Sequence, residues 1–202
     1  MKLIGLCGRS GSGKGYVSEC FLHYEIPSID TDALYREMTC AGEHPSGCVR
    51  EIADAFGGDM INTDNSLNRR KLGEAVFSDP EKLALLNRIT HKHILDKVRA
   101  DADRFEKAGC RALIVDAPLL FESGFDRECD FTVAVVAPEE KRIERIIRRD
   151  GITRDAAEAR LRAQMSDREL EERCDFTVHN GGDDEKMRCD IEAVVKALFG
   201  KE

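Results

Sequence analysis

The chain has 202 residues, of which 42% are hydrophobic and 35% are charged, and its net charge is −8. This length and composition suffice for one domain with a small lid or insertion. The negative charge argues against general affinity for nucleic acid or for an anionic membrane, so an anionic ligand has to be bound by local groups. We therefore expect small-molecule partners, and the sequence carries no signal for an oligomeric state.

The lengths of the apolar runs and the positions of the cysteines argue against membrane-spanning, disulfide-bonded and zinc-binding classes of protein. No stretch approaches 18 consecutive apolar residues, and the N-terminus enters a strand pattern directly instead of a basic and then apolar leader, so we expect a cytoplasmic protein. The eight cysteines form no Cys-x-x-Cys pair and are spread over predicted strands and helices. This predicts reduced, mostly buried thiols and no disulfide framework or zinc site.

The first predicted elements are a strand over 3–7 and a helix over 16–23, with a glycine-rich loop between them. The loop reads GRSGSGKG over 8–15, which has the GxxxxGK spacing of a phosphate-binding loop. Its glycines let backbone N–H groups converge on an anion at the helix N-terminus, and Lys14 is expected to reach the β- and γ-phosphates. A glycine-rich turn that binds nothing is the alternative. The residues predicted to bind ATP here are Gly8, Gly11, Ser12, Gly13, Lys14, Gly15 and Tyr16.

Position 15 departs from the usual form of this motif. A Ser or Thr there ligates Mg²⁺ in other phosphate-binding loops, and this chain has Gly15. Tyr16 is a poor substitute for that hydroxyl, although its backbone N–H can donate to an α-phosphate. The sequence GKG resembles the loop of adenylate-kinase-like enzymes, so we interpret it as a kinase variant in which water completes the metal shell.

A second strand is predicted over 26–30, and two acids lie at its end. Ligands of open α/β sheets bind beyond the carboxyl ends of the strands, so Asp32 is a candidate for accepting the proton of an attacking hydroxyl or for holding the metal. Aspartate also commonly caps the helix at such a junction. We assign the capping role to Asp30 or Thr31 and the chemical role to Asp32.

Residues 40–80 break the alternation of strands and helices. Turn-forming residues surround short helical patterns such as 49–56, which predicts an inserted helical region. Apolar residues at three-, four- and five-residue intervals then predict a long helix from 80 to about 109. His91 and His93 are two residues apart on it and cannot share a helical face, so they do not suggest a metal site. Either is a candidate ligand contact or a surface histidine.

A third strand is predicted over 112–116 from an apolar run typical of a parallel strand buried on both faces. Asp116 ends this run in the Walker-B arrangement, which places it near the Mg²⁺ shell. The loop 117–122 follows, and its apolar residues are expected to contact an organic substrate or the protein core.

A fourth strand is predicted over 131–136, and Pro138 opens a basic helix. Ile143, Ile146 and Ile147 form its buried stripe, so that arginines at helical spacing lie on another face (Arg142, Arg145 and Arg149). These arginines are either a solvated face or groups that stabilise charge during phosphoryl transfer, and we favour the second interpretation.

The C-terminal elements begin with a helical excursion over 149–165 that carries charges of both signs, as expected for a mobile lid. The last strand is predicted over 176–178 and the closing helix over 185–199. Asn180 follows the strand and is expected either to hydrogen-bond the adenine edge or to serve as a turn residue.

Seven stretches, in this order and at compatible separations, resemble the dephospho-CoA kinase family. They are GRSGSGKG, IDTDALYR, FGGDMINTDNSLNRRKLGEAVFSDP, NRITHKHI, VDAPLLFESG, RIIRRDGITRDAAEARLRAQM and VHNGG. The third and fifth are more specific than the phosphate-binding loop, which hundreds of unrelated enzymes share. The chain departs from the family pattern at Gly15 and Tyr16, at Asn68 where an acid is common, and at Lys92 where proline usually follows the histidine.

The resemblance implies an α/β fold in which a parallel-sheet P-loop kinase core is flanked by helices. It divides the chain into a core of 1–38, 110–148 and 174–202, a helical substrate-binding insertion of 39–109 and a lid of 149–173. The implied reaction is ATP-dependent phosphorylation of the 3′-hydroxyl of the dephospho-CoA ribose, the last step of coenzyme A synthesis, with Mg²⁺ as cofactor.

The resemblance also implies roles for individual residues. The catalytic residues are Asp32 as general base, Lys14 and Arg145. Arg149 and Asn180 join the phosphate-binding loop in binding ATP, and Asp116 holds the metal, directly or through water. The implied substrate-binding residues are Asp32, Arg36, Arg69, Phe77, His91, Leu119 and Leu120. Two alternatives remain open: a nucleoside monophosphate kinase, and a nucleotide-binding sensor without catalysis.

Overall fold

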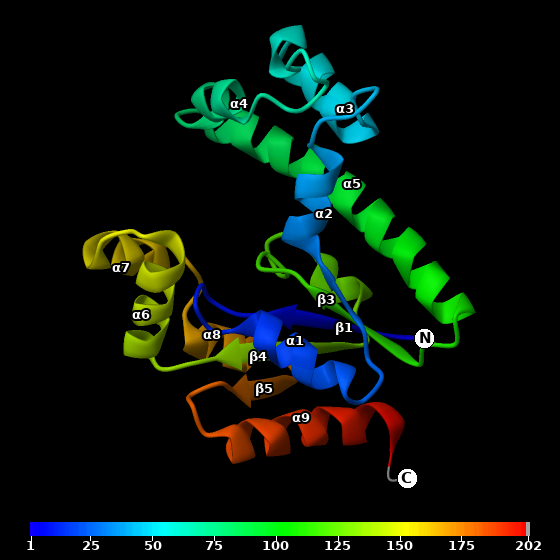
Figure 1. The fold of residues 1–202 in the computed structure, drawn as a ribbon, viewed down its shortest axis with the longest axis vertical. Coiled ribbons are helices and arrows are strands. Elements are labelled where there is room, and N and C mark those ends of the chain that lie inside the picture. Colours follow the sequence, from blue (N-terminus) through cyan, green and yellow to red (C-terminus); the bar gives the residue numbers. More distant parts are fainter. Residues whose placement is uncertain (201–202) are drawn as a thin grey trace. The chain divides into compact units, whose positions relative to one another are not determined.

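The structure is a computed structural model that describes residues 1–200 of the chain (Figure 1). Its strands are β1 (Lys2–Cys7), β2 (Ser28–Asp30), β3 (Ala112–Asp116), β4 (Phe131–Val136) and β5 (Phe176–His179). Its α-helices are α1 (Lys14–Leu22), α2 (Thr31–Met38), α3 (Gly47–Phe56), α4 (Arg69–Val76), α5 (Pro80–Lys107), α6 (Glu139–Asp150), α7 (Arg154–Arg162), α8 (Asp167–Arg173) and α9 (Asp184–Phe199). Two 3₁₀ helices are η1 (Gly58–Met60) and η2 (Phe125–Glu128).

The chain divides into two compact units. One comprises Met1–Ile29 and Arg104–Glu202, and the other comprises Asp30–Asp103. The first unit carries the sheet and the glycine-rich loop, and the second carries helices α2, α3 and α4 and most of α5. Each unit has its own hydrophobic core.

The sheet has the strand order β2-β3-β1-β4-β5. β1 pairs in parallel with β3 and β4, and β4 pairs in parallel with β5. The register sets Leu6 opposite Asp116, Cys7 opposite Ala134 and Val136 opposite His179. The carboxyl ends of these four strands therefore lie along one edge of the sheet, which is where open α/β sheets bind ligands.

Helices α1 and α9 cover a face of the sheet. Val17 and Phe21 of α1 and Met187 and Ile191 of α9 belong to the same buried cluster as strand residues such as Ile4. At about 25 cal/mol per Å² of apolar surface removed from water, each fully buried side chain of this size stabilises the fold by roughly 1.5–3 kcal/mol. This packing fixes the N-terminal end of α1, and with it the preceding loop, against the sheet.

Helix α7 packs against α6 through a separate small cluster in which Ile143 and Ile146 meet Ala157 and Leu161. In the second unit, α3, α4, η1 and the first half of α5 surround a core of nine buried residues (Cys48, Val49, Ile52, Ala53, Met60, Leu67, Leu72, Val76 and Ile89). None of the helices described between residues 1 and 200 combines the length and the apolar character that crossing a bilayer requires.

The structure confirms the predicted parallel sheet, its five strands, the inserted helices, the long helix α5 and the closing helix α9. Helix α8 was not predicted, because Leu170 is its one buried residue and so it has no apolar periodicity. A capping box between Ser166 and Glu169 starts it, and the S-x-x-E pattern was the available signal. The prediction of mostly buried thiols is wrong, because two of the eight cysteines are buried (Cys7 and Cys48), four are partly exposed, and Cys40 and Cys189 are exposed.

Candidate active site

The glycine-rich loop joins β1 to α1 and takes a backbone path that requires glycine at two positions. Gly11 and Gly13 have φ values of 77° and 85°, in the left-handed region that other residues rarely adopt. A Cβ on Gly11 would lie 2.7 Å from the Arg142 carbonyl oxygen, and one on Gly13 would lie 2.2 Å from the Asn180 side-chain nitrogen. The loop is therefore packed tightly against α6 and against the residue after β5.

Lys14 begins α1, and its ammonium group lies between the loop and the end of β3. Its Nζ donates to the Gly8 carbonyl oxygen at 3.3 Å and lies 3.7 Å from Oδ1 of Asp116. Both side chains are largely buried, with 14% and 16% of their surface exposed. The predicted Walker-B acid and the loop lysine are thus brought together, since β3 is the neighbour of β1 in the sheet.

Asn180 fixes the loop from the carboxyl end of β5. Its side-chain Nδ2 donates to the Ser12 carbonyl oxygen at 2.8 Å, and its backbone N–H donates to the Val136 carbonyl oxygen at 2.8 Å. Asn180 is 6% exposed. In this structure its amide therefore holds the phosphate-binding loop, a contact that the sequence analysis missed.

Arg145 of α6 makes contacts similar to those of Asn180. Its Nη1 donates to the carbonyl oxygens of Gly11 at 3.0 Å and Ser12 at 3.2 Å, and its Nη2 lies 3.4 Å from the Asn180 carbonyl oxygen. Arg145 therefore binds two carbonyl groups of the loop from α6. Its predicted catalytic role stays a prediction.

Replacing Asn180 with alanine is expected to lower the free energy of unfolding by about 0.5–1.5 kcal/mol, because the Ser12 carbonyl oxygen loses one of its two donors and keeps Arg145. The dissociation constant for ATP should rise as the loop loosens. Chemical denaturation and calorimetric titration measure the two effects. Asn87→Ala, an exposed asparagine on α5, is the matched control and should change stability by no more than about 0.5 kcal/mol. Equal stability of both variants would refute the anchoring role.

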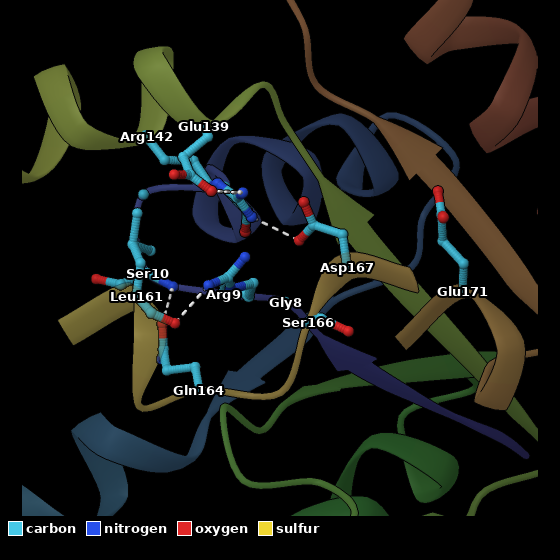
Figure 2. Close-up of polar contacts among 12 residues, drawn as sticks. Gly8, Arg9, Ser10, Glu139, Arg142, Leu161, Gln164, Ser166, Asp167 and Glu171 are labelled. Carbon is cyan, nitrogen blue, oxygen red and sulfur yellow. Dashed lines mark hydrogen bonds and ion pairs between the residues drawn. The ribbon is translucent and has the colours of Figure 1, made fainter. Parts of the chain in front are cut away.

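Two further contacts tie the loop to the end of α7 (Figure 2). The Arg9 guanidinium donates to the Leu161 carbonyl oxygen, and the Ser10 backbone N–H donates to Oε1 of Gln164 at 2.9 Å. The Ser10 amide belongs to the loop that is expected to surround a phosphate. In this structure, therefore, one backbone N–H group of the loop donates to a glutamine oxygen.

Arg142 is buried, with 2% of its surface exposed, so the prediction that it shares a polar face of α6 with Arg145 and Arg149, either solvated or available to a phosphate, is wrong at this position. Its Nη1 lies 2.5 Å from Oδ1 of Asp167, at the start of α8, and its Nη2 lies 3.8 Å from Glu139 (Figure 2). A buried guanidinium needs such partners, because an unpaired buried charge is strongly destabilising. Arg142 therefore joins α6 to α8 and is not available to a ligand.

Arg149, at the end of α6, is exposed and is bound to the adjacent carboxylate. Its Nε and Nη2 donate to Asp150 at 2.7 and 3.0 Å, and its Nη2 also reaches the Ser10 hydroxyl at 3.4 Å. Arg160 of α7 pairs with the same carboxylate. Hydrogen bonds from Arg149 and then Arg160 lower the pKa of Asp150 to about 2. The guanidinium of Arg149 is thus within reach of the loop through Ser10.

The two leucines in the loop after β3 differ in their exposure to solvent. Leu119 is 51% exposed, whereas Leu120 is fully buried. A Cβ on Gly5 would lie 2.8 Å from Leu120, which shows how closely that side chain covers β1. Of the two predicted substrate contacts, only Leu119 is exposed enough here to touch a ligand. The Cζ atom of Arg173 lies over the ring of Phe121, 4.0 Å from the ring centroid. This contact connects the loop to α8.

In the second unit, Asp30, which ends β2, and Asp32, which follows it, have different roles in α2. Asp30 caps α2, and its Oδ1 accepts from the backbone N–H of Asp32 at 2.8 Å and of Ala33 at 3.1 Å. This confirms the capping assignment. Asp32 lies in the first turn of α2 and is exposed. Arg36 lies one turn further on, is exposed, and has Nη2 3.6 Å from Asp30.

The other predicted substrate residues lie on separate elements of the second unit. Arg69 begins α4, donates to the Thr39 hydroxyl at 2.7 Å and stacks on Tyr35 with its Cζ 5.3 Å from the ring centroid. Phe77 follows α4 and is 93% exposed, and His91 is partly buried on α5. A phenyl ring this exposed has an apolar face available to a ligand.

Asn68 and Lys92, two residues at which the chain differs from the usual family pattern, make structural contacts in the same unit. The Asn68 side chain accepts from the Lys71 backbone N–H at 3.1 Å and caps α4. Lys92 pairs with Glu51 at 2.9 Å.

The chain resembles known proteins over nearly its whole length. A family model described as dephospho-CoA kinase matches residues 2–185. The dephospho-CoA kinase of Lactobacillus johnsonii is 36% identical over 179 residues, which cover 89% of each chain. That of Carboxydothermus hydrogenoformans is 34% identical over 196 residues, which cover 97% of this chain and 94% of the relative.

Solved structures share the fold of this chain. A crystal structure of a Thermus thermophilus protein superposes with a TM-score of 0.81 at 31% identity, covering 98% of both chains. A shikimate kinase from Bacteroides thetaiotaomicron has a TM-score of 0.55 at 14% identity and shares the fold alone. The phosphate-binding loop, the acid at the end of β3, the family model and the curated relatives lead to one conclusion: the chain belongs to the dephospho-CoA kinase family.

Proposed function

We propose that this protein transfers the γ-phosphoryl group of ATP to the 3′-hydroxyl of the dephospho-CoA ribose, which completes coenzyme A synthesis. Family membership supports this reaction. The observation that carries the proposal is the GxxxxGK loop, whose lysine lies 3.7 Å from the acid at the end of β3. That pairing is the arrangement in which P-loop kinases hold the phosphates of a nucleotide.

In the proposed mechanism, the loop amides and Lys14 bind the triphosphate, and Asp32 accepts the proton of the ribose hydroxyl. Arg149, and Arg145 where it is not bound to the loop carbonyls, offset negative charge on the transferring group. Catalysis then consists of positioning and charge stabilisation, because phosphoryl transfer requires little covalent chemistry from the protein. We assign 39–109 to the CoA side and 149–173 to a lid that excludes water.

A Mg²⁺ ion fits this donor set with Asp116 as the protein ligand, directly or through water. Among residues 1–200, no three His, Cys, Asp or Glu side chains gather as a metal site, and Mg²⁺ typically keeps several waters and binds through one or two carboxylates plus substrate phosphates. Bound there, the ion would neutralise charge on the β- and γ-phosphates.

Gly15 has open space around it, since a Cβ there would meet no atom within 4 Å. Gly15→Ser is therefore expected to be tolerated and to supply the missing hydroxyl, lowering the Mg²⁺ concentration for half-maximal rate by up to about tenfold. It should also stabilise α1 by about 0.5 kcal/mol, because glycine is a poor helix former. Steady-state rates across a Mg²⁺ series and thermal unfolding measure the two effects.

Gly73→Ser is the matched control, because Gly73 lies inside α4 and a Cβ there also meets nothing within 4 Å. It should give the same stabilisation with no change in Mg²⁺ dependence. An unchanged Mg²⁺ dependence in Gly15→Ser would contradict metal binding beside residue 15.

We also place the protein in the cytoplasm, where both substrates are expected and where thiols stay reduced.

A coupled assay of ADP release tests the function directly. We expect turnover with dephospho-CoA as acceptor, a dependence on ATP, and no comparable turnover with nucleoside monophosphates. Product analysis should find the new phosphate on the ribose 3′-oxygen. A rate no greater than the water background with dephospho-CoA, or preference for a nucleoside monophosphate, would overturn the proposal.

A further inference from the structure

Two cysteine side chains that are 167 positions apart in the sequence meet beside the phosphate-binding loop. The Sγ atoms of Cys7 and Cys174 lie 3.5 Å apart. Cys7 is the last residue of β1 and is 1% exposed. Cys174 follows α8 and is partly exposed. Cys7 is therefore shielded from solvent, whereas part of Cys174 is accessible to it.

The sheet brings these residues together. β4 lies between β1 and β5, with Cys7 opposite Ala134 and Ala134 opposite Thr177. Cys174 lies three residues before Thr177, in the segment that joins α8 to β5, and from there its Sγ lies beside that of Cys7. Cysteine pairing across three strands leaves no sequence pattern such as Cys-x-x-Cys.

We propose that Cys7 and Cys174 form a reversible disulfide that lowers the rate of phosphoryl transfer. An S–S bond is about 2.05 Å long, so the two sulfurs have to approach by about 1.5 Å from the 3.5 Å seen here. Side-chain rotation and a small backbone shift supply movements of this size. The effect on rate rests on the proposed function, whereas bond formation does not.

The chemistry is thiol–disulfide exchange with a low-molecular-weight disulfide as oxidant. The Cys174 thiolate attacks one sulfur of the disulfide and releases the first small thiolate. Cys7 then loses its proton to solvent and attacks Sγ of Cys174, which releases the second small thiolate. Two protein thiols are oxidised and one small disulfide is reduced to two thiols, so that electrons and atoms balance.

The surroundings assign these two roles. The hydrogen bond with Cys7 lowers the pKa of Cys174, burial opposes this, and a hydrogen bond with Thr132 and the charge of Arg173 lower it further. The hydrogen bond with Cys174 and then burial raise the pKa of Cys7. The thiolate is the nucleophile in this exchange, so the partly exposed Cys174 reacts first and the buried Cys7 second.

The position of Cys7 connects the bond to catalysis. Gly8 follows it directly and is tightly packed, since a Cβ there would lie 2.5 Å from the Val135 carbonyl oxygen. The Gly8 carbonyl oxygen accepts from Lys14 at 3.3 Å. A shift of Cys7 toward Cys174 therefore moves the start of the loop and the ammonium group that binds phosphate.

The test incubates the full-length protein with glutathione and glutathione disulfide at a series of ratios, followed by thiol alkylation and peptide mass spectrometry. We expect a peptide pair linked through residues 7 and 174. The same samples should lose phosphoryl transfer by about tenfold to 10²-fold, because a displacement of about 1 Å at a catalytic group costs a factor of this order. Dithiothreitol should restore both the thiols and the rate.

Cys174→Ser keeps the size of the side chain and should retain its rate under oxidation. Cys189→Ser, which removes an exposed thiol on α9, is the matched control and should lose rate as the wild type does. Absence of the linked peptide in the wild type, or an unchanged rate once it has formed, would overturn the inference. A reduced wild type without turnover would count against the proposed function alone, because the linked peptide is scored without an activity assay.

Discussion

Asp32→Asn is expected to lower kcat for dephospho-CoA phosphorylation by about 10²–10⁴-fold, the range that a positioned general base contributes. The amide keeps the size and hydrogen-bonding capacity of the side chain but cannot take a proton from the ribose hydroxyl. Asp32 is exposed, so its replacement should leave the fold intact. The dissociation constant for ATP should therefore stay within about twofold of the wild type, since surface substitutions rarely perturb structure. Steady-state kinetics and calorimetric titration measure these quantities.

The chain offers a close control two residues away. Asp30 caps α2 by accepting from two backbone N–H groups, and asparagine caps helices about as well as aspartate. Asp30→Asn should therefore retain the wild-type kcat, although the same carboxyl group becomes the same amide. An equal loss of kcat in the two variants would show that negative charge near the start of α2 supports catalysis in general. It would rule out Asp32 as the general base. A wild type that binds ATP but shows no turnover to lose would instead favour the nucleotide sensor.

Lys14→Met is expected to lower kcat/KM for ATP by about 10²–10³-fold, the loss produced by removing one preorganised group that stabilises transition-state charge. Methionine keeps the unbranched shape of the lysine stem and removes the ammonium group, which lies 3.7 Å from Oδ1 of Asp116. Both KM for ATP and kcat should change, because this charge contacts the phosphates before and during transfer.

Lys2→Met is the matched control for this variant. Lys2 lies on β1, is half exposed and pairs with Asp130 on the surface, so its loss should cost at most about 1 kcal/mol of stability and leave the kinetics unchanged. Circular dichroism of both variants verifies folding. Wild-type kinetics in Lys14→Met would mean that the glycine-rich loop is a turn without a ligand.

Local patterns predicted the phosphate-binding loop and the acid at the end of β3 correctly in position, because both depend on a few consecutive residues. The strand 112–116 was predicted with the observed bounds, since an apolar run marks a strand buried on both faces. Helix α1 begins at Lys14, two residues before its predicted start, because the left-handed Gly13 precedes it. Loop glycines mark such boundaries only when their φ angles are known.

The arginines of α6 show where helical spacing fails. Spacing placed Arg142 with Arg145 and Arg149 on one polar face, but Arg142 is buried against Asp167. Periodicity treats every charged residue as exposed, whereas a neighbouring helix that supplies a carboxylate can bury one. The partner helix α8 had itself escaped prediction, so the sequence offered no partner for this guanidinium.

By itself, the sequence determined the parallel α/β class, the phosphate-binding loop, a helix cap at Asp30 or Thr31, and the family. Each of these depends on residues adjacent in the chain or on motifs in linear order. Only the tertiary structure decided that Asn180 holds the Ser12 carbonyl oxygen, that Gln164 binds the Ser10 amide and that Cys7 meets Cys174. The physical reason is that these contacts join residues more than 150 positions apart, and strand order and register, which leave no local periodicity, set which of them become neighbours.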